Sequence, residues 1–231
     1  MKSAAPSPRL LFISGLKREA AIAHGPDALA ICGSAETLRA KLAEATTPLR
    51  LTISFGLCGG LDPALRSGDV VIGTQVLAGG AGLVADQNVA RELAARLGAA
   101  GERVSLGAVA GVDAPILTTA AKAELRKATM AASVDMESHI AARLAAHHKS
   151  PFAILRVVSD PADRDLPPLV TKAVRPDGSV DLGAVASALI HSPAQTAGLI
   201  AAARDSALAF ATLRRCRRLS GLFFGLGLAH R

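Results

Sequence analysis

The chain has 231 residues, half of them hydrophobic, and it carries 26 Lys and Arg against 19 Asp and Glu. This length predicts one domain, residues 1–231, and the 19% of charged residues excludes a mainly disordered protein. No apolar run approaches the roughly 20 residues that span a bilayer, no secretory leader is evident, and the three cysteines are widely spaced, so we expect a cytoplasmic protein without a metal site.

Short apolar runs alternate along the chain with Ala-rich stretches of helical period. Strands are predicted at 10–14, 29–32, 51–55, 70–75, 104–110 and 152–158. Helices are predicted at 35–45, 84–97, 119–130, 137–148, 184–191 and 194–213. Apolar strands interleaved with helices indicate an α/β fold, in which helices flank a central mixed, mostly parallel sheet. The longest irregular stretch, 161–183, follows a strand end, where α/β proteins place ligand-binding loops.

Most of the excess positive charge lies near the C-terminus. From Arg204 onward six Arg face one Asp, which is a net +5 of the chain's +7. Nucleic-acid binders usually spread their basic residues along a groove with aromatic platforms, and this chain has no Trp or Tyr, so we predict no nucleic-acid partner. From about residue 213 a basic cluster precedes an apolar run with two Phe: Arg214, Arg215, Arg217, Arg218, Phe223 and Phe224. This tail suits an anionic membrane surface, but we favour a helix end that packs on the body or on another subunit.

Two of the four segments that hold chemically useful residues lie in the N-terminal half. Ser14-Gly-Leu-Lys-Arg-Glu19 follows the first strand, where its charges could face solvent or a cleft. The Gly-rich segment Gly56–Ile72 has neither the ending of a P-loop nor the spacing of a dinucleotide fingerprint. It predicts a strand and a tight turn, at which a ligand could approach the backbone near Cys58 and Gly59 closely.

The other two segments place carboxyl groups beside predicted elements. Val134-Asp-Met-Glu137 leads into a helix, where an acid could complement the helix dipole or bind sugar hydroxyls. A buried strand then delivers Arg156, Ser159, Asp160 and Asp163 to its carboxyl end. A partly desolvated acid there could donate a proton, although a simple Asp-Pro turn also explains the pattern.

Together these segments resemble the superfamily of purine nucleoside phosphorylases and 5′-methylthioadenosine nucleosidases. The resemblance rests on Gly56–Ile72, Val134–Glu137 and Arg156–Asp163, and it extends over about residues 9–165. Within the superfamily, the Leu-Lys-Arg-Glu opening, Val-Asp-Met-Glu-Ser and Ser-Asp-Pro-Ala-Asp are most similar to the hopanoid-associated phosphorylases. That resemblance implies release of adenine from adenosylhopane, no cofactor, and a homo-oligomer.

The resemblance also implies a role for individual residues. Asp160 would protonate the leaving purine at N7, with Ser159 holding it in place. Glu137 would bind the ribose hydroxyls above Met136, and the backbone at Ile116 would read the adenine edge. Glu19 would activate water, as in the nucleosidases. Because Pro115 stands where relatives stack an aromatic ring, the base would rest on backbone and aliphatic contacts.

The nucleophile stays open at this point. Ser54 and Leu57 stand where phosphorylases of the superfamily carry phosphate ligands, an Arg and a Ser. The remaining phosphate candidates are Gly15, Lys17, Arg18 and Arg39. The family name favours phosphate slightly over water, with phosphate as a co-substrate, while Glu19 favours hydrolysis. The alternatives are a hydrolytic 5′-methylthioadenosine or S-adenosylhomocysteine nucleosidase, a non-catalytic nucleoside- or lipid-binding relative, and an ordinary cofactor-binding protein.

Overall fold

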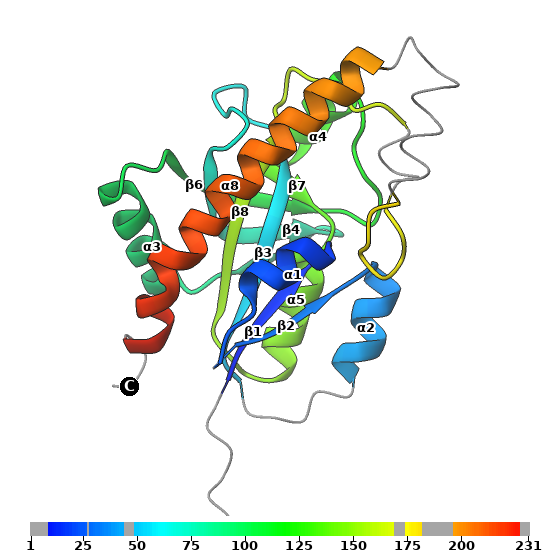
Figure 1. Ribbon diagram of the computed structural model, residues 1–231. Coiled ribbons are helices and arrows are strands. Elements are labelled where there is room, and N and C mark those ends of the chain that lie inside the picture. Colours follow the sequence, from blue (N-terminus) through cyan, green and yellow to red (C-terminus); the bar gives the residue numbers. More distant parts are fainter. Residues whose placement is uncertain (1–8, 27, 44–48, 169–173, 182–195, 227–231) are drawn as a thin grey trace, which may run out of the picture.

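Eight strands form one mixed sheet in the computed structural model (Figure 1). They are Arg9–Ser14 (β1), Ala28–Cys32 (β2), Leu49–Gly60 (β3), Val70–Ala78 (β4), Ala81–Val84 (β5), Val104–Gly111 (β6), Ser133–Asp135 (β7) and Phe152–Asp160 (β8). The helices are Lys17–Ala23 (α1), Ala35–Ala43 (α2), Gln87–Ala99 (α3), Thr119–Thr129 (α4), Ser138–His147 (α5) and Thr196–Leu226 (α8). The structure describes residues 9–26, 28–43, 49–168, 174–181 and 196–226.

The sheet is mixed and mostly parallel, which confirms the predicted fold class. β2, β1, β3 and β8 follow one another as parallel neighbours. β8 pairs antiparallel with β4, which continues in parallel through β6 to β7, and β7 returns antiparallel to β3. β3, β8, β4, β6 and β7 therefore close into a ring. The carboxyl ends of β1, β2, β3 and β8 lie at one edge, where an α/β sheet binds ligands.

Helices cover both faces of the sheet, because successive apolar side chains along a strand point alternately into two cores. Leu10 and Phe12 point into a core with α1, α3 and α8, whereas Leu11 and Ile13 point into a core with α2 and α5. Figure 1 shows α8, coloured orange to red, crossing one face of the sheet beside β8, α3 and α1. Burial on both faces explains why these strands read as continuous apolar runs.

The Gly-rich segment differs from its prediction, because residues 56–60 continue β3 instead of forming a tight turn. Gly56 pairs with Arg156 and Gly59 with Asp160, so the strand runs on beside β8. A Cβ atom at Gly56 would lie 2.6 Å from the Glu19 Oε1 atom, and one at Gly59 would lie 2.9 Å from the Asp160 Oδ2 atom. These glycines therefore leave room for carboxyl groups rather than for a bend.

Several short elements were not predicted. α1, β5 and β7 are absent from the predicted set, and they have only seven, four and three residues. The helix expected from Val84 begins at Gln87, because the Asp86 carboxylate caps it by accepting the N–H groups of Asn88 and Val89. The helix predicted at 184–191 lies outside the described residues.

The basic tail continues α8 and, as far as Ser220, packs on the body of the protein. Leu213, Cys216 and Ser220 are buried. The Arg215 guanidinium lies 2.6 Å from Glu102 Oε1, and that of Arg217 donates to the Ala23 carbonyl oxygen at 3.0 Å. Among the described helices, none is long and apolar enough to cross a membrane.

Candidate active site

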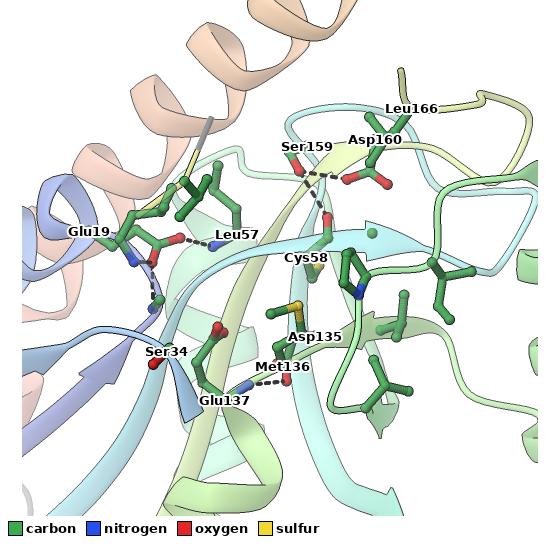
Figure 2. A pocket seen from close by; sticks show the side chains of 18 of the residues that line it. Glu19, Ser34, Leu57, Cys58, Asp135, Met136, Glu137, Ser159, Asp160 and Leu166 are labelled. Atoms are coloured by element: carbon green, nitrogen blue, oxygen red, sulfur yellow. Dashed lines mark hydrogen bonds between the residues drawn. The ribbon is translucent and has the colours of Figure 1, made fainter. Parts of the chain in front are cut away.

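A cavity of about 440 Å³ lies at the edge of the sheet where β1, β2, β3 and β8 end. It collects nine of the residues predicted for the site: Gly15, Glu19, Cys58, Gly59, Ile116, Met136, Glu137, Ser159 and Asp160. Figure 2 shows Glu19 on one side of the cavity, Ser159 and Asp160 on the other, and Met136 and Glu137 between them. Segments far apart in the sequence thus meet at one place because the strand ends do.

The phosphate candidates do not form an anion site together. Lys17 Nζ lies 2.5 Å from Asp177 Oδ2, and the Arg18 guanidinium stacks 4.1 Å from the centre of the Phe210 ring. Neither residue lines the cavity. The Gly15 N–H does face it, but this group donates to Glu19 Oε2 at 2.9 Å.

Arg39 is likewise engaged elsewhere, since its guanidinium lies 3.4 Å from Asp113 Oδ1. A phosphate dianion needs charge-assisted donors, usually from Arg or Lys. None of the three basic candidates lines the cavity, so in this arrangement they do not offer such donors there.

Glu19 lies at the start of α1 with its carboxylate turned into the site. The residue is 2% exposed, and three backbone N–H groups donate to it, those of Gly15, Leu16 and Leu57, at 2.8 to 2.9 Å. Burial raises the pKa of Glu19, and the Arg156 charge and these backbone donors oppose that rise. The geometry fixes a carboxylate that can accept a proton from a group bound in the cavity.

Arg156 is the central cation beneath the cavity, and its side chain is fully buried. Its Nε atom lies 2.8 Å from Asp135 Oδ2, and its Nη1 atom lies 3.1 Å from Glu137 Oε2. It also donates to the Leu57 carbonyl oxygen at 3.1 Å and to Ser54 Oγ at 2.5 Å. The sequence predicts Arg156 near the end of a strand, but no role for this residue followed from it. Its partners are all far from it in the chain or on other elements, so no local pattern could reveal them.

Glu137 shares this cation and stands at the N-terminal end of α5. Asp135 Oδ1 accepts the N–H groups of Glu137 and Ser138, and so fixes the turn that aims Glu137 into the cavity. Burial raises the pKa of Glu137 to about 8, opposed by Arg156 and reinforced by the negative charges of Asp135 and Glu19. With three carboxyl groups around one guanidinium, a proton is retained within the cluster over much of the neutral range.

This retained proton predicts a pH-dependent stability. Because folding raises the pKa of Glu137 from 4.5 to about 8, the folded protein binds more protons than the unfolded one, and the free energy of unfolding falls as pH rises across that window. Replacement by Gln removes the free-energy cost of ionising a buried carboxyl group at this position. Glu137→Gln is expected to raise Tm by about 2–4 °C or more above pH 8, and to leave it near the wild-type value at pH 4.5. Thermal melts against pH, with exposed Glu124→Gln as control, test this; equal Tm differences at both pH values contradict it.

Asp160 ends β8 on the opposite side of the cavity from Glu19. Ser159 Oγ lies 2.8 Å from Asp160 Oδ1 and 3.3 Å from the Cys58 carbonyl oxygen, so its hydroxyl contacts the Asp160 carboxyl. Burial raises the pKa of Asp160, opposed by the Lys122 ammonium and by the Ser159 hydroxyl. Asp160 is 8% exposed, so it is an acid in a largely desolvated position at the cavity wall.

The remaining walls are mostly aliphatic. Val112, Pro115, Ile116, Leu117 and Leu166 line the cavity together with Leu16, Val134, Val174 and Pro176. Pro115 lines the cavity, and none of the described lining residues is aromatic. Part of the predicted ligand loop 161–183 does reach the cavity, through Leu166 and residues 174–176.

Comparisons with solved structures give the same fold. The futalosine hydrolase of Helicobacter pylori strain 26695 superposes with a TM-score of 0.70 at 10% identity, over 94% of this chain and 98% of that one. The 5′-methylthioadenosine/S-adenosyl homocysteine nucleosidase of Helicobacter pylori gives 0.68 at 11% identity, over 93% and 98%. The 5′-methylthioadenosine nucleosidase of Arabidopsis thaliana gives 0.62 at 15%, over 97% of each chain.

No curated protein sequence matches the chain. A family model does, that of the phosphorylase superfamily, over residues 32–191. This span holds β3, β7 and β8, the strands that carry Gly59, Asp135 and Asp160 to the cavity. The match covers more than half of the sequence, and the chain belongs to the phosphorylase superfamily.

Proposed function

We propose that this protein cleaves the N-glycosidic bond of a 5′-substituted adenosine and releases adenine. The observation that carries the proposal is the placement of Glu19 and Asp160 on opposite sides of one cavity, with Glu137 and Met136 between them (Figure 2). A nucleoside fits this order with its base at Asp160, its ribose over Met136 with hydroxyls on Glu137, and its nucleophile at Glu19. The nucleosidases among the structural neighbours support the choice of an adenine nucleoside.

The chemistry follows from where charge develops. As the bond between C1′ and the base breaks, its electron pair moves onto the purine and the sugar gains oxocarbenium character. Protonated Asp160 gives its proton to N7, so the base leaves neutral. Ionised Glu19 takes a proton from water as the water oxygen bonds to C1′. Proton transfer of this kind contributes about 100- to 10,000-fold to a rate.

Water is the nucleophile that this geometry favours, although the family name favoured phosphate slightly. Lys17, Arg18 and Arg39 are engaged away from the cavity, the Gly15 N–H donates to Glu19, and Arg156 is already shared by Asp135 and Glu137. A phosphate dianion next to Glu19 would meet a like charge in a desolvated place. A bound water needs only the acceptor that the Glu19 carboxylate provides.

The 5′ substituent proposed here is an apolar one, with adenosylhopane of hopanoid biosynthesis as the substrate. The motif resemblance to the hopanoid-associated phosphorylases supports it, and so do the aliphatic side chains of Leu16 and Val174 in the cavity wall. The test is adenine release from adenosines that carry a methylthio group, a homocysteine group or a long alkyl chain at the 5′ position. A higher kcat/KM for the alkyl substrate than for the homocysteine substrate supports an apolar substituent, and the reverse order overturns it.

A bilayer-resident substrate gives the basic tail a role in this proposal, at the cytoplasmic face of a membrane. Arg214 and Arg218 are exposed on α8, whereas Arg215 and Arg217 contact the body. The double charge reversal Arg214→Glu/Arg218→Glu is expected to weaken binding to anionic vesicles by about 10-fold or more, since each basic residue near such a surface contributes about 1 kcal/mol. Vesicle sedimentation measures this, with Arg91→Glu on α3 as control. Unchanged binding, or none to begin with, removes the role.

A further inference from the structure

Lys122 is a buried cation that touches the proposed proton donor. The residue lies on α4 with a fully buried side chain, and its Nζ atom is 2.8 Å from Asp160 Oδ2. It also donates to the Pro161 carbonyl oxygen at 2.9 Å and to that of Arg164 at 3.0 Å. With a longer contact to the Asp160 carbonyl oxygen at 3.4 Å, four acceptors surround Nζ, an arrangement that suits the three N–H groups of an ammonium ion better than the two of a neutral amine.

The helix that carries Lys122 is tied to the loop that follows Asp160. The Thr119 N–H donates to Asp165 Oδ1 at 2.6 Å, and the Leu166 N–H donates to the Leu117 carbonyl oxygen at 2.7 Å. Helix and loop therefore hold the ammonium at a fixed place. A buried charge costs free energy unless it is paired and hydrogen-bonded, and a buried Lys is rare without such a reason.

We propose that Lys122 is a positioning residue of the reaction, which fixes the Asp160 carboxyl at the base end of the site and controls its ionisation through its buried charge. The inference rests on the proposed function, in which Asp160 carries the proton for the base. Among the described residues, Lys122 from α4, Asp205 from α8 and Cys58 from β3 act electrostatically on Asp160 or are acted on by it. The Asp205 charge raises the pKa of Asp160 as burial does, and burial raises the pKa of Cys58, so Lys122 is the cation that opposes these effects.

The consequence appears in the pH dependence of catalysis. Asp160 must hold its proton to donate it, so kcat/KM falls as pH rises through the pKa of Asp160. The Lys122 charge lowers that pKa against the effect of burial. Removing the charge lets Asp160 keep its proton to a higher pH. An opposite charge at this distance is worth about 1–3 pH units.

The experiment compares the pH profile of kcat/KM in four variants. Lys122→Gln keeps donors for the two carbonyl oxygens and loses the charge, Lys122→Met loses both, and Lys122→Arg keeps the charge. Lys127→Gln, exposed on the same helix, is the control. We expect the alkaline limb to move to a pH about 1–3 units higher in Lys122→Gln and Lys122→Met. It should stay in place in Lys122→Arg and in the Lys127→Gln control. A uniform loss of activity at every pH, with the limb unmoved, would overturn the proposal.

A second measurement does not depend on activity. The Asp160 carboxyl carbon is followed by NMR in protein labelled with ¹³C-aspartate, and its signal is identified by its absence in Asp160→Asn. Asp160 should titrate about 1–3 pH units higher in Lys122→Gln than in the wild type. An unchanged midpoint contradicts the inference. If the wild type releases no adenine, the proposed function fails, while this titration still decides whether Lys122 controls Asp160.

Discussion

Asp160→Asn is expected to lower kcat/KM for adenine release by about 100- to 10,000-fold, the contribution of a general acid. The amide has nearly the same shape and can still contact Ser159 and Lys122, but it has no acidic proton for N7. The purine would then have to leave as an anion from a largely desolvated place. Because the cavity walls are unchanged, binding of an adenine nucleoside should survive within a few-fold, and calorimetry measures it.

The control for this variant is Asp163→Asn, an exposed acid three residues further along the chain. It should keep activity near the wild-type value. If Asp160→Asn retains activity within a few-fold of the wild type, Asp160 is not the proton donor. If binding disappears together with activity, its role is in holding the base rather than in protonating it.

Glu19→Gln is expected to lower kcat by a similar factor of about 100- to 10,000-fold, since an amide cannot take a proton from water. Its oxygen can still accept one of the backbone N–H groups that hold Glu19, so α1 should keep its start. Burial raises the pKa of Glu19, and a base works only when ionised, so the wild-type kcat/KM should rise with pH through a limb above the usual range of a glutamic acid.

The acid limb of the pH profile identifies Glu19 as the base more directly than the loss of kcat does. It should disappear in Glu19→Gln and persist in Glu36→Gln, an exposed acid in the first turn of α2. A limb that remains in Glu19→Gln at the same pH would assign it to another group and remove Glu19 as the base.

Part of the cavity lining was predictable because parallel strands bring their carboxyl ends to one edge. Asp160 ends β8, and Glu19 lies in the first turn of the helix that follows β1, so this edge accounts for both. Glu137 follows β7, which runs antiparallel to β3, and it was singled out as an acid ahead of a helix instead. The fold class followed in the same way from apolar strands alternating with helices. The prediction of a tight turn in the Gly-rich segment was wrong. A tight turn and the close approach of a carboxyl group both require a residue without a side chain, so glycine alone does not tell them apart.

The remaining features depend on tertiary partners. Arg156 lies within an apolar strand and Lys122 within an Ala-rich helix, where a charged residue usually faces solvent. Only the folded chain shows that carboxyl groups from other elements meet both of them. The short strand β7 also depends on tertiary partners. Its three residues form a strand because they pair with β3 on one side and β6 on the other.

The most direct test of hydrolysis is the identity of the sugar product when adenine is released, measured with phosphate absent and with phosphate at saturation. We expect adenine to form at the same rate in both, with the free 5′-substituted ribose as the product in both. Release that requires phosphate and yields the sugar 1-phosphate would contradict it, since an anion site would then have to exist beside Glu19.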